Sequence, residues 1–179
     1  MITIIAMSAV LLGQAQTLKC PVMGGAVAQN TTFVEYQGAQ FGFCCPGCEG
    51  NFAKSPDKLI ETQRKAGNTV GSFLFDPVTR KRIDPSKAIS SKDANGIRFY
   101  FASAESATAF DRSPSAFSAI PKREALYCPV GKEALSTYAK ASDYVDYDGV
   151  RWYMCCEGCG DPFEKNPRQY LTQAALAYV

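Results

Sequence analysis

The fold is decided by one stretch, Phe41-Gly42-Phe43-Cys44-Cys45-Pro46-Gly47-Cys48, in which cysteines directly follow an aromatic run. Aromatic residues favour a β-strand, and we expect a helix to begin around Pro46. Cys44 then stands at the end of the strand and Cys48 in the first helical turn. Two thiols separated in this way can point at one centre, so the stretch predicts a metal-binding corner.

The same pattern occurs again near the C-terminus, as Trp152-Tyr153-Met154-Cys155-Cys156-Glu157-Gly158-Cys159. A distant cysteine precedes each copy, in Cys20-Pro21-Val22 and in Cys128-Pro129-Val130. Each copy also has a Tyr-x-Gly turn before the aromatic run and a Phe-x-Lys-x-Pro series after it. Agreement at so many ordered positions predicts an internal repeat.

A third copy lies between these two, and its cysteines are gone. It opens with Asp76-Pro77-Val78, and Phe99-Tyr100-Phe101-Ala102-Ser103-Ala104-Glu105-Ser106 stands where the cysteine run would be. Ala102, Ser103 and Ser106 occupy the cysteine positions. Because the aromatic packing residues remain while the ligands are lost, we expect this copy to fold but not to bind metal.

Each copy predicts a ββα unit, so the fold class is α+β with three tandem repeats at residues 17–67, 71–121 and 124–177. Pro in the Cys-Pro-Val segment and the glycines Gly24, Gly25 and Gly131 predict a tight turn with positive φ. The hairpin turns are expected at Gln37-Gly38, Asn95-Gly96 and Asp148-Gly149. The first helices should begin around Pro46, Ala104 and Glu157. Ser-Pro or Asn-Pro steps should end them, and second helices are expected at 57–65, 115–120 and 168–177.

A single unit of this kind is too small to be stable on its own core, so metal or packing between repeats has to supply the deficit. The chain contains eight cysteines and no histidine, so any metal must be held by sulfur or oxygen. The candidate ligands are Cys20, Cys44, Cys45, Cys48, Cys128, Cys155, Cys156 and Cys159. Soft thiolates favour zinc or copper(I), and two clusters predict about two ions per chain.

The number of sulfurs per ion stays open. Adjacent cysteines on a strand point to opposite faces, so either the strand ends at the first cysteine or only three sulfurs bind. Three sulfurs suit copper(I) or an exchangeable ion better than closed structural zinc, which takes four ligands. Met23 and Met154 offer further soft sulfurs, although packing is their ordinary role.

Disulfide bonds are the main alternative to metal. An even number of cysteines in an exported chain is typical of a disulfide framework, for example with Cys20 bonded to Cys48. The spacing favours metal, and the joint loss of all cysteines from the middle copy supports this reading. Oxidation and metal binding can also alternate. A thioredoxin-like redox role for Cys45-Pro46-Gly47-Cys48 is a weaker alternative, because the βαβ surroundings are missing.

The composition excludes other functions. With a net charge of +2 and basic residues spread along the chain, no clustered basic face indicates nucleic-acid binding. The absence of histidine removes the usual general base, and no nucleophile–base pair indicates an enzyme. Asp143, Asp146 and Asp148 are expected at a solvated strand edge.

The N-terminus is typical of a signal peptide, at residues 1–15. An apolar run reaches Leu12, and Gly13-Gln14-Ala15 places small residues at the positions that signal peptidase prefers. The run is too short for a comfortable membrane span, and no other segment could span a bilayer. We therefore expect a periplasmic or secreted protein without a membrane span in the mature chain.

At these motifs the sequence resembles the YHS/TRASH domains. Those are small cysteine-containing, treble-clef-like modules associated with heavy-metal sensing, trafficking and resistance. The family pattern of one Cys followed by Cys-x-x-x-Cys maps onto Cys20, Cys44 and Cys48, and onto Cys128, Cys155 and Cys159. Cys45 and Cys156 are additions to that minimal pattern. The middle copy keeps an Asp-Pro-Val opening like that of YHS domains but has no cysteine.

These features predict an exported protein that sequesters a soft metal ion or passes it on, with another metal-handling protein as a possible partner. One alternative is a structural or interaction protein whose repeats are held by zinc or disulfides. Another is a thiol–disulfide redox protein. The oligomeric state stays open.

Overall fold

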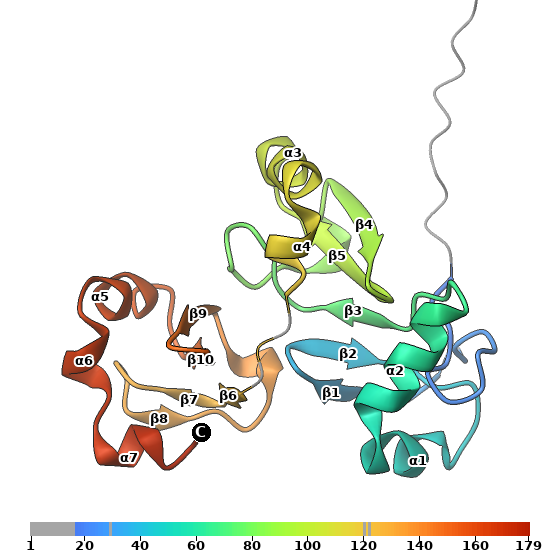
Figure 1. The fold of residues 1–179 in the computed structure, drawn as a ribbon, viewed down its shortest axis with the longest axis horizontal. Helices are drawn as coiled ribbons and strands as arrows, with labels where there is room; N and C mark the ends of the chain where they lie inside the picture. The colour runs from blue at the N-terminus through green and yellow to red at the C-terminus, as the bar shows by residue number, and fades with distance from the viewer. Residues whose placement is uncertain (1–16, 29, 120, 122) are drawn as a thin grey trace, which may run out of the picture.

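The computed structural model describes residues 17–28, 30–119, 121 and 123–179, and its architecture is mixed α+β, as predicted (Figure 1). The expected signal peptide at 1–15 lies outside the described residues. The first and middle repeats share one five-stranded sheet, whose strand order is β1-β2-β3-β5-β4. Its strands are β1 (Val34–Tyr36), β2 (Ala39–Phe41), β3 (Gly71–Phe73), β4 (Ser90–Ala94) and β5 (Ile97–Phe101).

The third repeat builds sheets of its own. A three-stranded sheet has the order β6-β10-β9, and β7 and β8 form a separate antiparallel pair. The strands are β6 (Arg123–Ala125), β7 (Tyr127–Cys128), β8 (Glu133–Ala134), β9 (Asp143–Tyr147) and β10 (Val150–Met154). β6 runs parallel to β10 just as β3 runs parallel to β5, so the strand before the Cys-Pro-Val or Asp-Pro-Val turn is placed alike in the two repeats.

Three hairpins carry the aromatic strands, and each turns where the sequence predicts. The turn residues Asn95 and Gly96 have φ values of 53° and 79°. Asp148 and Gly149 have 51° and 74°, and the Gln37-Gly38 pair follows the same pattern. Two successive positive φ values define the type I′ turn, whose twist matches that of the flanking strands. The register of each hairpin is therefore set locally.

The Cys-Pro-Val and Asp-Pro-Val segments form the same turn in all three repeats. The fifth residue of each turn has positive φ: Gly24 at 70°, Arg80 at 63° and Lys132 at 56°. In the first repeat, Cys20 N–H donates to Gly25 O. The equivalent pairs are Asp76 with Lys81 in the middle repeat and Cys128 with Glu133 in the third. The predicted tight turn is confirmed, and of the three glycines that permit positive φ only Gly24 adopts it, since the left-handed residue in the third repeat is Lys132.

The first helix of each repeat ends at a Ser-Pro or Asn-Pro step, as predicted, because the residue before Pro avoids the helical region. The helices of the first two repeats are α1 (Cys48–Lys54), α2 (Pro56–Lys65), α3 (Ala104–Arg112) and α4 (Pro114–Phe117). Those of the third are α5 (Gly160–Lys165), α6 (Pro167–Tyr170) and α7 (Gln173–Leu176). Two short 3₁₀ helices, η1 (Pro85–Lys87) and η2 (Tyr138–Lys140), precede hairpins.

Four helix predictions need correction, the first being that the helix expected at 115–120 is α4, which ends at Phe117. α1 begins at Cys48 rather than Pro46, because Gly47 is left-handed with φ 88°. α5 begins at Gly160 rather than near Glu157, after a turn in which Cys159 N–H donates to Cys156 O. The helix expected at 168–177 is split into α6 and α7, because Thr172 is extended and its hydroxyl caps α7. The start of α3 at Ala104 agrees with the prediction.

The third repeat packs against the other two. The Asp-Pro-Val turn of the middle repeat adds to the edge of β9: Arg82 N–H donates to Ser142 O, and Tyr144 N–H donates to Arg80 O. Arg151, only 5% exposed, binds the Asp146 carboxylate through two hydrogen bonds of 2.8 Å. Its guanidinium also stacks on Tyr144 of its own repeat and lies over Phe73 of the shared sheet. Packing between repeats therefore supplies part of the core that no single repeat has.

Candidate metal centres

Each candidate centre is assembled from three elements that the local sequence positions. One cysteine lies in the Cys-Pro-Val turn, one follows the aromatic strand, and one stands where the first helix begins. In the first repeat these are Cys20, Cys44 and Cys48, and in the third they are Cys128, Cys155 and Cys159. Residues far apart in the chain are thus brought to one point by a turn, a hairpin and a helix start.

The sulfur atoms of each triad lie within 4.8 Å of one another. Four thiolates at about 2.3 Å from a zinc ion are about 3.8 Å apart, so this spacing fits a soft metal ion. Cys20 and Cys128 are fully buried, and Cys48 and Cys159 are 4% exposed. Cys44 and Cys155 are half-buried, so solvent reaches each triad from the side of one ligand. Each triad could therefore hold a metal ion with a coordination position left for an exchange partner.

Gly131 is needed for the close approach of the turn to the strand end in the third repeat. A Cβ atom at Gly131 would lie 2.5 Å from Cys155 Sγ and 3.5 Å from Cys128 Sγ. Its backbone N–H donates to Cys128 Sγ at 3.2 Å. A larger residue would thus displace the Cys155 sulfur, and the glycine serves a close contact rather than a positive φ.

The surroundings of the first triad lower the pKa of one cysteine and raise the pKa values of the other two. Burial raises the pKa of Cys20, but backbone N–H groups, those of Met23 and Cys44 among them, outweigh burial and hold the pKa below its ordinary value. Burial and hydrogen bonding to the Cys20 thiol raise the pKa of Cys44. The hydrogen bond with Cys45, followed by burial, raises the pKa of Cys48. A metal ion that binds all three thiolates must therefore displace protons.

The third repeat has a thioether sulfur beside its cysteines. Burial, followed by hydrogen bonding to Cys128, raises the pKa of Cys155 to about 11. Met154 is fully buried, and its Sδ lies 4.0 Å from Cys128 Sγ. In the first repeat Phe43 occupies the equivalent position, and Met23 is 68% exposed. Packing in the core therefore explains the presence of Met154, but it does not explain that of the exposed Met23.

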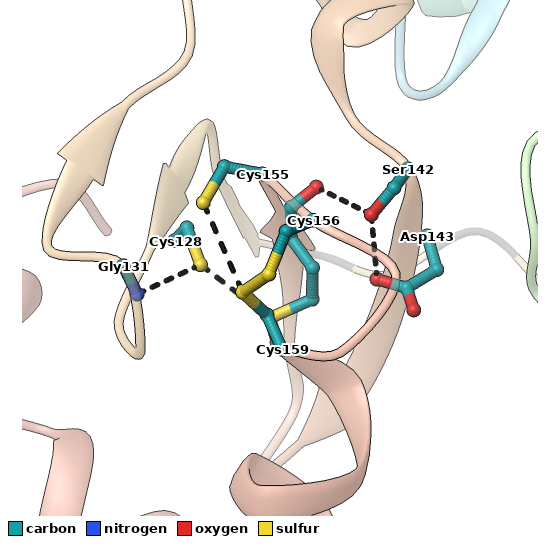
Figure 2. The surroundings of a disulfide bond; sticks show 8 residues. Cys128, Gly131, Ser142, Asp143, Cys155, Cys156 and Cys159 are labelled. Atoms are coloured by element: carbon teal, nitrogen blue, oxygen red, sulfur yellow. Dashed lines mark hydrogen bonds between the residues drawn. A yellow bond between two sulfur atoms is a disulfide. The ribbon is translucent and has the colours of Figure 1, made fainter.

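Cys45 and Cys156 belong to neither of the triads found among the described residues. Cys156 forms a disulfide bond with Cys159, and Cys45 Sγ lies 3.1 Å from Cys48 Sγ. Figure 2 shows the disulfide beside the thiols of Cys128 and Cys155. The disulfide offered as an example from the sequence, between Cys20 and Cys48, is absent, because both residues are free cysteines. The bonded pair is instead the local Cys-x-x-Cys.

The middle repeat closes the equivalent corner with a carboxylate. Asp76, 1% exposed, accepts hydrogen bonds at Oδ1 from the backbone N–H groups of Val78 and Thr79, at 2.9 and 3.2 Å. Its Oδ2 accepts from Ala102 N–H at 2.9 Å. Ala102 occupies the position of Cys44, so the carboxylate joins the turn to the strand end, as a metal ion would in the outer repeats.

Asp143 is buried, whereas the sequence predicted that it would lie at a solvated strand edge. Its side chain is 8% exposed, and burial raises its pKa to about 6. Figure 2 places it beside Ser142, whose hydroxyl donates to the Met154 carbonyl at 3.2 Å, next to the third-repeat cysteines. No periodicity signalled this burial, because it results from the middle-repeat turn covering β9 at Lys81.

Comparison with known proteins supports the resemblance seen in the motifs. The family model of the YHS domain matches residues 135–174, which contain Cys155, Cys156 and Cys159 but not Cys128. No curated protein and no solved structure matches the chain. Among the described residues, no helix is long and apolar enough to cross a bilayer. Residues 135–174, in the C-terminal part of the chain, therefore resemble a YHS domain.

Proposed function

We propose that this protein is an exported soft-metal-binding protein that holds one zinc or copper(I) ion at each cysteine triad. Its role is to sequester the metal or pass it to another metal-handling protein, in trafficking or resistance. The observation that carries the proposal is the convergence of three sulfurs within 4.8 Å in two separate repeats. The YHS domain at 135–174 supports it, because the family is associated with heavy metals.

Within this proposal, the three repeats are treble-clef-like modules, and each ion is bound by three thiolates. Cys20 and Cys128 anchor the ion from the turn, Cys48 and Cys159 from the helix start, and Cys44 and Cys155 from the strand end. The half-buried position of this last pair favours exchange over a closed structural site.

The middle repeat supports a metal-handling role over a purely structural one. Asp76 joins the turn and the strand end with hydrogen bonds alone, so this fold can hold the two segments together without a metal ion. Two repeats nevertheless bring three cysteine sulfurs together with one half-buried member, and Cys159 is a thiol ligand once its disulfide bond with Cys156 is reduced. If the cysteine triads served only to stabilise the fold, a site that allows the ion to exchange would add no stability. We propose no catalytic activity for the chain.

The test is the metal content of full-length protein purified under reducing, oxygen-free conditions. We expect two ions per chain, and one ion in each of Cys20→Ser and Cys128→Ser. Ser106→Ala is the matched control, because Ser106 stands at the Cys48 position of the repeat without ligands. Comparison of Cys44→Ser with Cys45→Ser separates three-sulfur from four-sulfur centres, since only the former variant should lose metal. Wild-type protein with eight free thiols and no metal would refute the proposal.

Export is tested separately. Cell fractionation with intact-mass measurement should find the chain outside the cytoplasm and shortened by residues 1–15. A full-length mass in the cytoplasmic fraction would reject export and leave the metal proposal standing.

A further inference from the structure

Cys45 and Cys156 have no place in the triads, yet each reaches the last cysteine of its own triad. The Cys45 and Cys48 sulfurs are 3.1 Å apart, and the Cys156 and Cys159 sulfurs are bonded. The two pairs occupy the same positions in their repeats. Since Cys48 and Cys159 are also triad members, one sulfur in each repeat has two alternative partners.

We propose that each Cys-x-x-Cys pair is a thiol–disulfide switch that controls its neighbouring metal centre. Formation of the disulfide withdraws Cys48 or Cys159 from the triad, and reduction returns it. The metal-release half of this proposal rests on the proposed function, whereas the disulfide half stands on the cysteine geometry alone. The oxidant is a disulfide, either a small molecule such as oxidised glutathione or an oxidised protein.

The reaction is ordinary thiol–disulfide exchange, and it balances. The Cys45 thiolate attacks one sulfur of the oxidant, which forms a mixed disulfide and releases the first thiolate. The Cys48 thiolate then attacks Cys45 Sγ, forms the Cys45–Cys48 bond and releases the second. The two cysteines lose two electrons, which the oxidant gains, and the two thiol protons pass to the released thiolates. The Cys156 and Cys159 pair follows the same steps.

Exposure assigns the two roles within each pair. Cys45 and Cys156 are exposed, so a bulky disulfide can reach them. Cys48 and Cys159 are 4% exposed and are reached only by a thiol already next to them. The exposed cysteine is therefore the attacking residue, and the buried one closes the bond. Gly47 in the left-handed conformation and Pro46 shape the turn that brings the first pair together.

The consequence for the metal follows from coordination chemistry. A disulfide sulfur lacks the thiolate charge that zinc and copper(I) require, so oxidation leaves two thiolates where there were three. An open centre with two remaining ligands releases its ion. The exported chain would then hold metal under reducing conditions and release it under oxidising ones.

The experiment compares reduced, metal-loaded wild-type protein with Cys45→Ser, Cys156→Ser and the double variant, each treated with oxidised glutathione without oxygen. Metal release is followed with a chromogenic chelator, and disulfides are mapped by alkylation and peptide mass spectrometry. Wild-type protein should form both Cys-x-x-Cys disulfides and release both ions. Each single variant should keep the ion of its own repeat, and the double variant should keep both.

The outcomes separate this inference from the proposed function. Wild-type protein that forms both disulfides but never held metal would support the redox pairs and reject the metal function. Metal-loaded protein that forms other disulfides, or a double variant that releases metal as fast as wild type, would overturn the switch. Because both substituted cysteines are exposed, the serine variants should fold, and disulfide mapping of the wild type needs no variant.

Discussion

The middle repeat and the two outer repeats close the same corner with different chemistry. In the outer repeats, three cysteine sulfurs converge from the turn, the strand end and the helix start. In the middle repeat, one buried carboxylate receives three backbone N–H groups from the turn and the strand end. The turn must therefore be tied to the strand–helix junction in each case. A hydrogen-bonded aspartate does so in the middle repeat, and we propose that a metal ion does so in the outer two.

The helix starts differ in the same way. Ser103 caps α3, because its hydroxyl accepts a hydrogen bond from Ser106 N–H. α1 and α5 have no side-chain cap: their N-caps are Gly47 and Cys159, and Cys45 and Cys156 stand at the Ser103 position of the sequence repeat. The first helices of the outer repeats thus lack the side-chain capping hydrogen bond that α3 has. The carboxylate and the helix cap thus belong to the middle repeat, and the cysteine triads to the outer two.

The largest expected change is a new metal centre in the middle repeat. The triple variant Asp76→Cys, Ala102→Cys and Ser106→Cys restores the pattern of the outer repeats. Because the turn and hairpin geometry is shared, its metal content should rise from two to three ions per chain. Elemental analysis measures this, with Asp76→Cys alone as the control. A metal content that stays at two ions per chain would show that the shared backbone geometry is not sufficient to create a metal site.

Removal of the Asp76 carboxylate should cost the most stability. Asp76→Ala leaves three backbone N–H groups without their acceptor in a buried site, which we expect to cost about 3 kcal/mol. Urea unfolding followed by fluorescence measures the loss. Asp76→Asn keeps the size but presents a donor on one side, so its loss should be smaller, about 1–2 kcal/mol. An Asp76→Ala variant as stable as wild type would refute the substitution of carboxylate for metal.

Metal removal should loosen only the outer repeats. Gly24 N–H donates to Cys20 O, and Arg80 N–H makes the same turn bond to Asp76 O in the middle repeat. A ligand at 100 times its dissociation constant stabilises by about 2.7 kcal/mol, so exchange of the Gly24 amide should accelerate about 100-fold on chelation. Hydrogen exchange should leave the Arg80 amide unchanged. Equal acceleration at both positions would mean that the metal stabilises the whole molecule.

The smallest expected effect is at the helix cap. Ser103→Ala removes the side-chain acceptor for Ser106 N–H and should cost about 1 kcal/mol in urea unfolding. Cys45→Ser, at the same position of the first repeat, should change the stability of the metal-bound protein far less. If Ser103→Ala costs no more than Cys45→Ser, then the Ser103 hydroxyl does not stabilise α3 as a cap.

The sequence by itself determined the repeat and its local parts. The Asn95-Gly96 and Asp148-Gly149 turns fix type I′ hairpins, because both central residues accept positive φ. Prolines after serine or asparagine end the first helices, because they restrict the residue before them. The spacing from Cys44 to Cys48 predicted the junction at which both thiols meet. These features depend on neighbours within a few residues, so composition and spacing reveal them.

Only the tertiary structure decided how the repeats are joined and what replaces the thiols. The five-stranded sheet shared by two repeats needs β3 between β2 and β5, and a contact between distant strands leaves no local signature. The burial of Asp143 and of Arg151 likewise depends on another repeat lying across them. The sequence showed that the middle repeat had lost its cysteines. The structure showed that Asp76 connects the turn to the strand end in this repeat. Its carboxylate accepts hydrogen bonds from backbone groups that lie next to each other only after folding.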